Sequence, residues 1–461
     1  MQKLGTKCTN LRSVIYYDKK MNTEMKNALK IYKEKTKKSA KLFEKSKKFH
    51  INGVHHNIRF FKPYPFITKT SKGKFLVDVD SNKYVDYWMG HWSLILGHVE
   101  KNIKLQTIQQ IKKGWMHGTA NQNAILLSEK IAKAVPIAEK IRYVSTGTEA
   151  TMYAVRLARA ITGRKTIAKI DGGWHGYTTD LLKTVNWPFN ESESKGLTDE
   201  KHIISLPLND LEKSLSMLQV IKDDLAGILI EPVLGGGGAI PATKDYLKGL
   251  DEFSKKNNSL FMLDEIVTGF RFRYGCLYET MNLKPDIVTL GKIVGGGFPI
   301  GVICGNEEIM QHANTSTHSK ANRTYIGGGT FSANPLSMIA GYSNLMTIKK
   351  KGKSLYSKIN GYGNDTRKML SKIFHDDVII TGKGSLFMTH FPKQGISQIT
   401  NAVDASKCDI EKLHNYHFEM IAKDGIFFLP GKLGAISDAH TNSDIKSMKK
   451  ATESFVSGLK K

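Results

Sequence analysis

Apolar residues recur at helical intervals at the start of the chain and form short β-rich runs further on. From residue 22 to 50 they lie between lysines and glutamates with the spacing of an amphipathic helix. Between residues 63 and 88, β-rich runs flank Asp80-Ser81-Asn82, a triplet that suits a tight turn, so we expect a hairpin. Helical spacing returns around residues 100–113 and 122–134.

The middle of the chain alternates between short β-rich runs and helical patterns. Such alternation indicates a mostly parallel sheet with helices on both faces, in which ligands bind at the carboxyl ends of the strands. The expected strands cover residues 141–144, 166–170, 227–231, 260–264 and 287–290, and the expected helices include 148–162 and 243–257.

The last part of the chain, from about residue 341, mixes helical patterns with strands near 378–381 and 425–429 and predicts a second lobe. We therefore expect four segments: an extension of unknown role at 1–20, an N-terminal helix and hairpin at 21–90, a large domain at 91–340, and a small domain at 341–461.

Composition excludes several classes of protein. With 461 residues, of which 40% are hydrophobic, the chain can bury a packed core and is too apolar to be disordered. No apolar run approaches the roughly 18–20 residues of a membrane helix, so we expect a soluble protein without a membrane partner. The four cysteines lack the spacing of a metal site or a disulfide framework, which favours a reducing, cytoplasmic compartment and no metal.

The net charge of +26 raises the question of a polyanionic partner. Residues 1–50 hold 15 Lys or Arg and 4 Asp or Glu, so they carry +11 of it, and the remaining chain is only mildly basic. This lysine-rich segment fits either a solvated amphipathic helix or a polyanion-binding face. Because the chain has no zinc-finger, RNA-recognition or helix-turn-helix signature, we expect no nucleic-acid partner.

The expected strand that ends near residue 144 leads into hydroxyl and glycine residues and then into a long helix. Exposed N–H groups at such a helix start, together with the hydroxyls of Thr146 and Thr148, can bind a phosphate. Thr146 and Glu149 lie three residues apart, so the same segment also fits a simple capping box.

Two further strand ends carry a carboxylate and a lysine. Asp264 closes an apolar strand and can hold a cationic ring nitrogen or a metal, or merely cap the next loop. Lys292 emerges from another strand just before Gly295-Gly296-Gly297, and partial burial would lower the pKa of its amine and suit it to Schiff-base formation. A phosphate site, a carboxylate and a lysine at strand ends of one domain are together what pyridoxal 5'-phosphate (PLP) requires.

Six motifs, in order along the chain, resemble those of the class III aminotransferases, and within that family the glutamate-1-semialdehyde aminomutase branch. They are residues 145–152 (STGTEATM), 171–176 (DGGWHG), 231–233 (EPV), 264–271 (DEIVTGFR), 290–301 (LGKIVGGGFPIG) and 329–335 (GTFSANP). The resemblance covers about residues 40–455. It implies the type I fold of PLP-dependent transferases, an α/β fold in which a large domain holds a mostly parallel seven-stranded sheet. The N- and C-terminal segments would form a smaller α+β lobe.

The resemblance also implies roles for residues around the cofactor. Lys292 would link to the cofactor aldehyde and carry the proton between carbons, and Asp264 would keep the ring nitrogen protonated. Trp174 would stack on one face of the ring, with Ile266 on the other. The phosphate would be bound by Thr146-Gly147-Thr148. The pyridoxamine 5'-phosphate form would occur during turnover.

Other implied roles concern the partner subunit and the substrate. Thr330 would reach the phosphate of the neighbouring subunit's cofactor, so we expect a homodimer with shared active sites. Arg59 occupies the position of the branch's substrate-carboxylate arginine, where a bidentate guanidinium is well suited. His56 stands where the aminomutases have a serine. The expected substrate is a small amino or oxo compound that carries a carboxylate.

Departures from the branch concern the substrate and leave two reactions open. Besides His56, Gly236 replaces an asparagine, and residues 429–435 form a shorter segment that lacks the branch's glutamate. One reaction is the isomerisation of glutamate 1-semialdehyde to 5-aminolevulinate, a step of porphyrin biosynthesis that needs no external amine donor. The other is transamination between a β- or ω-amino acid and a 2-oxo acid. A third hypothesis, a polyanion-binding protein without catalysis, would not require Lys292 and Asp264.

Overall fold

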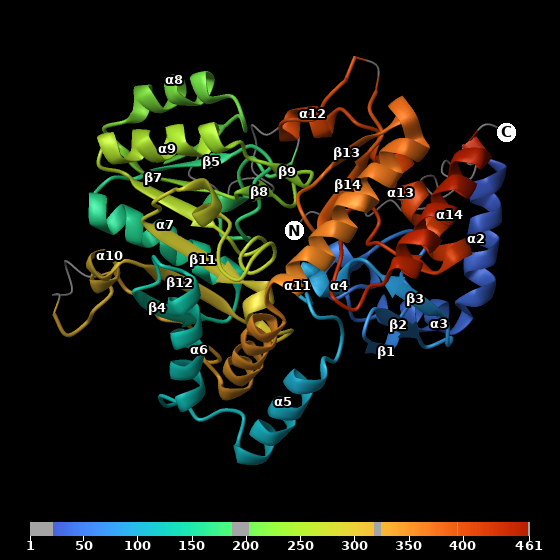
Figure 1. Ribbon diagram of the computed structural model, residues 1–461, viewed down its shortest axis with the longest axis horizontal. Helices are drawn as coiled ribbons and strands as arrows, with labels where there is room; N and C mark the ends of the chain where they lie inside the picture. Colours follow the sequence, from blue (N-terminus) through green and yellow to red (C-terminus); the bar gives the residue numbers. More distant parts are fainter. Residues whose placement is uncertain (1–21, 187–201, 318–323, 394, 460–461) are drawn as a thin grey trace, which may run out of the picture.

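The computed structural model describes residues 22–186, 202–317, 324–393 and 395–459. The extension expected at residues 1–20 lies outside these ranges. Figure 1 shows a large lobe around a central sheet and a smaller lobe in which the N-terminal (blue) and C-terminal (red) segments meet. None of the helices in the described ranges combines the length and the hydropathy needed to cross a membrane.

Seven strands form the sheet of the large lobe in the order β4-β12-β11-β10-β7-β5-β6. Their bounds are β4 Lys140–Val144, β5 Thr166–Ile170, β6 Ile203–Leu206, β7 Leu225–Ile230, β10 Leu260–Asp264, β11 Ile287–Gly291 and β12 Gly301–Gly305. Every neighbouring pair is parallel except those of β12, which runs antiparallel to β11 and β4. The expected fold class is confirmed, and β6 and β12 are strands that the sequence pattern did not predict.

Both faces of this sheet are buried because consecutive strand residues point to opposite sides. In β10, Phe261 and Leu263 belong to one hydrophobic cluster, which includes residues of α9 (Lys244–Lys256). Leu260 and Met262 belong to a second cluster, which includes residues of α7 (Gly147–Thr162). This explains why the strands read as continuous apolar runs, and it confirms the two helices expected in this region.

The single helix expected over residues 22–50 is wrong, because the chain forms two helices there. These are α2 (Thr23–Lys35) and α3 (Lys37–Ser46). They meet at Thr36, whose backbone leaves the helical region and whose Oγ1 donates to the carbonyl oxygen of Tyr32 at 2.6 Å. A threonine that bonds back to the preceding turn competes with the helical ladder in this way.

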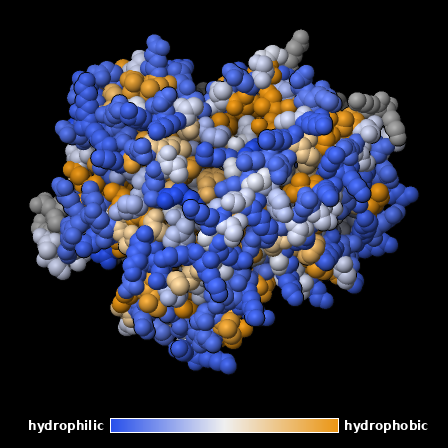
Figure 2. Space-filling view, viewed as in Figure 1, coloured by the Kyte–Doolittle hydropathy of each residue, from blue (hydrophilic) through white to orange (hydrophobic). Residues whose placement is uncertain are grey.

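The amphipathic character of α2 is confirmed. Its lysines are exposed, while its buried side is formed by Met25, Ala28 and Tyr32. Figure 2 shows that hydrophilic residues cover most of the face in view, with hydrophobic residues in separate patches. The last helix, α14 (Asn442–Leu459), lies against α2, since a Cβ placed on Gly458 would be 3.1 Å from Cγ of Glu24.

The expected hairpin is formed by β2 (Phe75–Asp78) and β3 (Lys83–Asp86). Asp78 closes the turn, because its Oδ1 accepts from the backbone N–H groups of Asp80 and Asn82 at 2.9 and 2.8 Å. Strand β1 (Thr68–Lys72) pairs with β2, and β15 (Ile426–Phe427) pairs with β3. The two ends of the chain thus share one four-stranded sheet.

A long helix, α11 (Pro335–Phe374), connects the lobes and contacts α5 (Lys101–Lys113) and α6 (Gln122–Ala134), the two helices expected there. The boundary set at residue 340 falls inside α11, and the division into four segments stays a prediction. The remaining elements are β8 Val233–Leu234, β9 Ile240–Pro241, β13 Ile379–Thr381, β14 Leu386–His390, β16 Gly434–Ala435, α8 Leu211–Ile221, α10 Glu307–Gln311, α12 Ala402–Ser406 and α13 Ile410–Glu419.

Candidate active site

Helix α7 begins at the carboxyl end of β4 with a complete capping box. The Thr146 side chain accepts from the N–H of Glu149 at 3.2 Å, and Glu149 Oε2 accepts from the N–H groups of Ser145 and Thr146 at 2.8 Å each. The capping-box interpretation is therefore confirmed, and it occupies both the hydroxyl and the amide of Thr146. The next two N–H groups, of Gly147 and Thr148, have no acceptor within the helix and form a site for an anion.

Two neighbouring loops lie close to the start of this helix. A Cβ on Gly147 would lie 2.7 Å from Cδ1 of Ile266, which follows β10. Gly176, which follows β5, has a φ of +91°, and a Cβ there would lie 2.5 Å from the Thr148 hydroxyl. Only glycine permits both approaches, so these glycines leave the helix start open beside the apolar Ile266 side chain.

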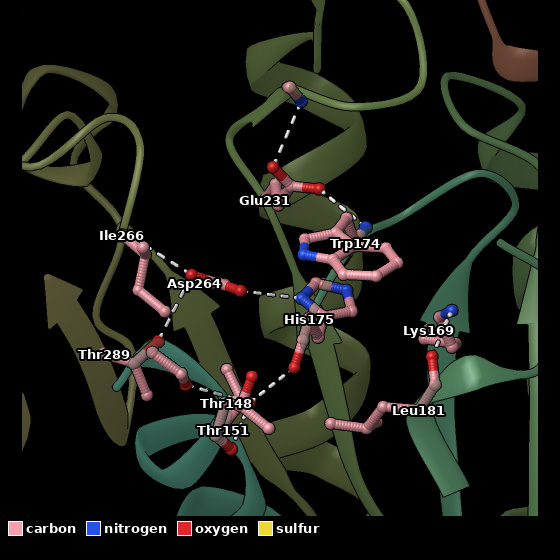
Figure 3. A network of polar contacts seen from close by, with 12 residues as sticks. Thr148, Thr151, Lys169, Trp174, His175, Leu181, Glu231, Asp264, Ile266 and Thr289 are labelled. Atoms are coloured by element: carbon pink, nitrogen blue, oxygen red, sulfur yellow. Dashed lines mark hydrogen bonds and ion pairs between the residues drawn. The ribbon is translucent and has the colours of Figure 1, made fainter. Parts of the chain in front are cut away.

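Asp264 lies at the end of β10 in a buried hydrogen-bond network, which Figure 3 shows. Its Oδ2 accepts from Nδ1 of His175 at 2.8 Å, and its Oδ1 accepts from the Ile266 N–H and the Thr289 hydroxyl at 3.1 and 3.3 Å. A carboxylate only accepts, so the histidine proton lies on Nδ1. Burial lowers the pKa of His175 despite this contact, and the ring is neutral.

His175 is a site residue that the sequence reasoning did not assign. Its Nε2 is buried and has no hydrogen-bond partner among the described residues. Its carbonyl oxygen accepts from the Thr151 hydroxyl of α7 at 2.6 Å, which ties the loop after β5 to the helix. The sequence did contain a signal for His175, because this residue lies in the motif 171–176 together with Trp174.

Glu231 follows β7 and lies next to Trp174 (Figure 3). Its Oε1 accepts from the Trp174 N–H and its Oε2 from the Gly235 N–H, both at 3.0 Å. Burial, together with the nearby charge of Asp264, raises the pKa of the Glu231 carboxyl to about 8. Trp174, held by this contact, leaves 42% of its surface exposed and can therefore cover a ligand.

Lys292 is the first residue after β11 and has a φ of +43°, in the left-handed region. Burial lowers the pKa of its amine, although the charges of Asp264 and Glu231 oppose that shift. Its Nζ lies 5.8 Å from the centre of the Trp92 ring. A lysine of this kind offers an amine that loses its proton more readily than an exposed lysine, which suits it to nucleophilic attack on a carbonyl carbon.

The turn that carries Trp92 is a second feature that the sequence did not reveal. The four residues of α4 (Met89–Trp92) all have left-handed backbones, with φ values of +46°, +59°, +62° and +65°. Each non-glycine residue in that region costs roughly 1–2 kcal/mol, and such conformations gather at functional sites. The Arg271 guanidinium donates to the Trp92 carbonyl oxygen, and the Trp92 indole donates to the carbonyl oxygen of Leu433 at 3.1 Å.

The predicted substrate residues Arg59 and His56 lie in and beside a short 3-10 helix (Asn57–Arg59), and both are exposed. Their side chains act electrostatically on His91, as does that of Lys292, so the three lie near one imidazole. Burial, with the Arg59 charge, lowers the pKa of His56.

Thr330 lies apart from these residues, since in the described part of the chain no hydrogen bond joins it to them. It lines a separate surface cavity with Met116–Ala120.

These residues fit PLP. The open N–H groups of α7 suit its phosphate, the buried Asp264 suits a protonated ring nitrogen, and Lys292 suits its aldehyde. Ile266 and Trp174 come from two different loops, as is required of residues that cover a flat ring from its two faces. The roles of the individual residues, including the phosphate role of Thr146, stay predictions.

Comparison with known proteins places these observations in context. The family model "Aminotransferase class-III" matches residues 60–421. A glutamate-1-semialdehyde 2,1-aminomutase of Methanosarcina acetivorans is 37% identical over 432 residues, which are 92% of this chain and 98% of that protein. An omega-transaminase from Sphaerobacter thermophilus has a TM-score of 0.84 at 26% identity and covers 92% of this chain and 98% of its own. A glutamate-1-semialdehyde-aminomutase from Pseudomonas aeruginosa in complex with PMP shares the fold, with a TM-score of 0.85 at 17% identity and 95% and 98% coverage.

Proposed function

The chain belongs to the class III aminotransferase family, and we propose that it acts on glutamate 1-semialdehyde as a PLP-dependent 2,1-aminomutase that forms 5-aminolevulinate. The observation that carries this proposal is the 34–37% identity to curated aminomutases over nearly their whole length. The site supports it, because Arg59 provides a guanidinium for the substrate carboxylate close to the His91 and Lys292 pair.

In this proposal each residue has a physical task. Bound PLP supplies an electron sink for the carbanion that forms when the amino carbon loses a proton. Lys292, with its lowered pKa, would take that proton and return it to the other of the two carbons that share the transferred nitrogen. Asp264 holds the proton of the ring nitrogen, and His175 fixes the Asp264 carboxylate by donating to it. Trp174 and Ile266 hold the ring between them and keep water from its faces.

The second candidate function is transamination between a β- or ω-amino acid and a 2-oxo acid. The observations that favour it are the replacements at the substrate side, His56 and Gly236, and the structural likeness to an omega-transaminase. The pyridoxamine form of the enzyme, given glutamate 1-semialdehyde and no second substrate, separates the two. Formation of 5-aminolevulinate supports the aminomutase, whereas turnover of an ω-amino acid with a 2-oxo acid and no 5-aminolevulinate supports the transaminase.

The chemistry itself is tested by the visible absorbance of the PLP-loaded protein. We expect Lys292→Ala to abolish the absorbance of covalently held cofactor, while Lys284→Ala, an exposed lysine just before β11, leaves it unchanged. An unaltered spectrum of Lys292→Ala would contradict the assignment of Lys292.

Two further proposals concern assembly and location. We propose a homodimer in which Thr330 contacts the cofactor phosphate of the partner subunit, which fits its exposed position in the structure. Thr330→Val would then weaken PLP binding without altering dimerisation in sedimentation experiments. A cytoplasmic location fits the three cysteines in the described ranges, Cys276, Cys304 and Cys408, which are all free thiols.

A further inference from the structure

Arg271, in the loop that follows β10, has a buried guanidinium without an anionic partner. Only 1% of the residue is exposed, and no ion pair joins it to a carboxylate in the described part of the chain. Arg159, by contrast, lies 2.5 Å from Asp180. Burial lowers the pKa of the Arg271 guanidinium to about 10, which still leaves it charged at neutral pH. A buried cation without an anion is destabilising, so the contacts that it does make have to offset that cost.

The Arg271 guanidinium donates to two acceptors from distant parts of the chain. Its Nη2 donates to the carbonyl oxygen of Trp92, the last residue of α4. Its Nη1 lies 3.4 Å from the hydroxyl of Ser385, just before β14, which is long for a hydrogen bond. The Nε–H is buried and has no partner among the described residues. The contact with α4 is therefore the strongest one that this buried charge makes.

Turn α4 needs such a contact, because its backbone is unfavourable. All four of its residues have a positive φ, although only one of them is a glycine. A strained backbone of this kind persists only where the surrounding structure fixes it. At the start of the turn, Oδ1 of Asp86 accepts from the N–H groups of Trp88 and Met89 at 2.8 and 3.0 Å. At its end, Arg271 binds the Trp92 carbonyl oxygen.

The same turn lies directly against Lys292. Figure 1 shows α4 between the two lobes, and α4 contacts both β16 and the short 3-10 helix Lys292–Gly295. The centre of the Trp92 ring lies 5.8 Å from Nζ of Lys292, and the His91 ring lies 5.0 Å from the Trp92 ring. A shift of the Trp92 backbone would therefore move this ring relative to the amine.

We propose that Arg271 is a positioning residue of the active site, which fixes the end of α4 and thereby holds the Trp92 ring beside the Lys292 amine. This inference rests on the proposed function, which makes that amine the reacting group. A guanidinium suits the task, because its N–H groups have a fixed planar geometry and can bind the Trp92 carbonyl oxygen and the Ser385 hydroxyl together. Its charge has a second effect: burial lowers the pKa of the Lys292 amine, and Arg271 acts in the same direction.

Fluorine NMR of the PLP-loaded enzyme tests the position of Trp92. The chain has five tryptophans, which can be replaced by 5-fluorotryptophan, and the Trp92 resonance is the one that is absent from Trp92→Phe. We expect Arg271→Met to shift and broaden this resonance, because α4 loses the contact at its end. Arg271→Lys should shift it as well, since an ammonium lacks the planar fork of donors.

Arg367→Met is the matched control. Arg367 also donates to backbone carbonyl oxygens, those of Gly384 and Leu386 at 2.8 and 2.6 Å, but within the described ranges it makes no hydrogen bond to α4. Its loss removes a partly buried arginine from the neighbourhood of Ser385 without touching the turn. We therefore expect Arg367→Met to leave the Trp92 resonance where it is in the wild type.

A second readout is the pKa of the Lys292 amine in the cofactor-free protein, measured by competitive acetylation at a series of pH values with detection by mass spectrometry. Arg271→Met removes a nearby cation and should raise this pKa by roughly one unit. Arg271→Lys keeps the positive charge and should leave the pKa unchanged, as should Arg367→Met. A role in packing alone would not separate the two Arg271 variants in this way.

Thermal unfolding provides an arm that does not depend on the folding of Arg271→Met. Glycine adopts a left-handed backbone without strain, so His91→Gly lets α4 keep its shape with less support. The loss of Tm caused by Arg271→Lys should therefore be smaller in the His91→Gly protein than in the wild type. An equal or larger loss would mean that Arg271 does not hold the turn.

The inference is overturned if both Arg271 variants show the wild-type Trp92 resonance, or if Arg367→Met shifts that resonance as much as they do. An unchanged Lys292 pKa in Arg271→Met also overturns it, because Arg271 would then be merely structural. None of these measurements uses an amino substrate, so their outcome is separate from that of the proposed function. An enzyme with an Arg271-dependent Trp92 resonance and Lys292 pKa that makes no 5-aminolevulinate refutes the aminomutase proposal and leaves this inference standing.

Discussion

The contact between His175 and Asp264 offers a quantitative test of the site. His175→Phe keeps the shape of a flat ring but removes the Nδ1 donor that lies 2.8 Å from Asp264 Oδ2. Both side chains are almost fully buried, so water does not replace the donor easily. The remaining donors, Ile266 N–H and Thr289 Oγ1, both bind Oδ1 and at longer distances of 3.1 and 3.3 Å. The variant therefore leaves Oδ2 of a buried carboxylate without a donor.

The magnitude follows from the value of a hydrogen bond to a charged group. Such a bond contributes about 1.5–3 kcal/mol, which corresponds to a factor of about 10–150 in an equilibrium or rate constant. Without this donor the Asp264 carboxylate becomes a stronger base and draws the proton away from the ring nitrogen, and the loss appears in the step that removes the substrate proton. We expect kcat/KM of His175→Phe to fall by about that factor, while PLP stays bound through Lys292.

Stopped-flow absorbance of the loaded enzyme, mixed with an amino substrate in a single turnover, measures this step. Thr289→Val is the matched control, because it removes the longer contact to the other carboxylate oxygen and should cost less. A His175→Phe enzyme that binds PLP and reacts within twofold of the wild type would refute the reasoning. So would a loss no larger than that of Thr289→Val.

Three further predictions concern the start of α7 and the carboxyl group beside it. Thr146→Ala removes the N-cap and should lower the stability of the cofactor-free protein by about 1 kcal/mol in urea denaturation, and an unchanged midpoint would contradict the cap. Gly147→Ala places a Cβ 2.7 Å from Ile266 and should weaken PLP binding severalfold in absorbance titrations, whereas Gly361→Ala, which meets nothing within 4 Å, should not. The Glu231 carboxyl has its pKa raised to about 8, so the folded chain holds a proton that the unfolded chain releases near its ordinary value of 4.5. The cofactor-free wild type should therefore lose stability as pH rises from about 5 to 8, and Glu231→Gln should remove that part of the decline in Tm measurements.

Those parts of the fold that local pattern encodes could be predicted from the sequence. Strands β10 and β11 were found because both of their faces are buried, which makes them continuous apolar runs that end at Asp264 and Lys292. Strand β12 (Gly301–Gly305) was missed, because glycine does not favour a strand. The segment is a strand because it pairs with β11 and β4. The break at Thr36 was missed for a similar reason, since a single hydroxyl contact decides it.

The left-handed turn α4 shows why part of the site could not be predicted. Nothing in the segment Met89-Gly90-His91-Trp92 except the glycine favours a left-handed backbone, and propensity alone argues against it. The turn is held by two residues far away in the chain, because Arg271 binds the Trp92 carbonyl oxygen and Leu433 accepts from its indole. Long-range contacts of this kind leave no local signal, so the position of His91 became visible only in three dimensions.

The charges around Lys292 favour one orientation of a bound amino acid. The electrostatic effects on the Lys292 amine include those of Asp264 and Glu231, whereas the largest such effects on His91 come from Lys292, His56, Lys432 and Arg59. Lys292 therefore lies between a side with the carboxyl groups of Asp264 and Glu231 and a side with the basic groups around His91. A protonated ring nitrogen is stabilised on the first side, and a substrate carboxylate is stabilised on the second. An amino acid that enters with its carboxylate toward His91 presents its reacting end to Lys292, whereas the reverse orientation would place its carboxylate beside Asp264, which would repel it.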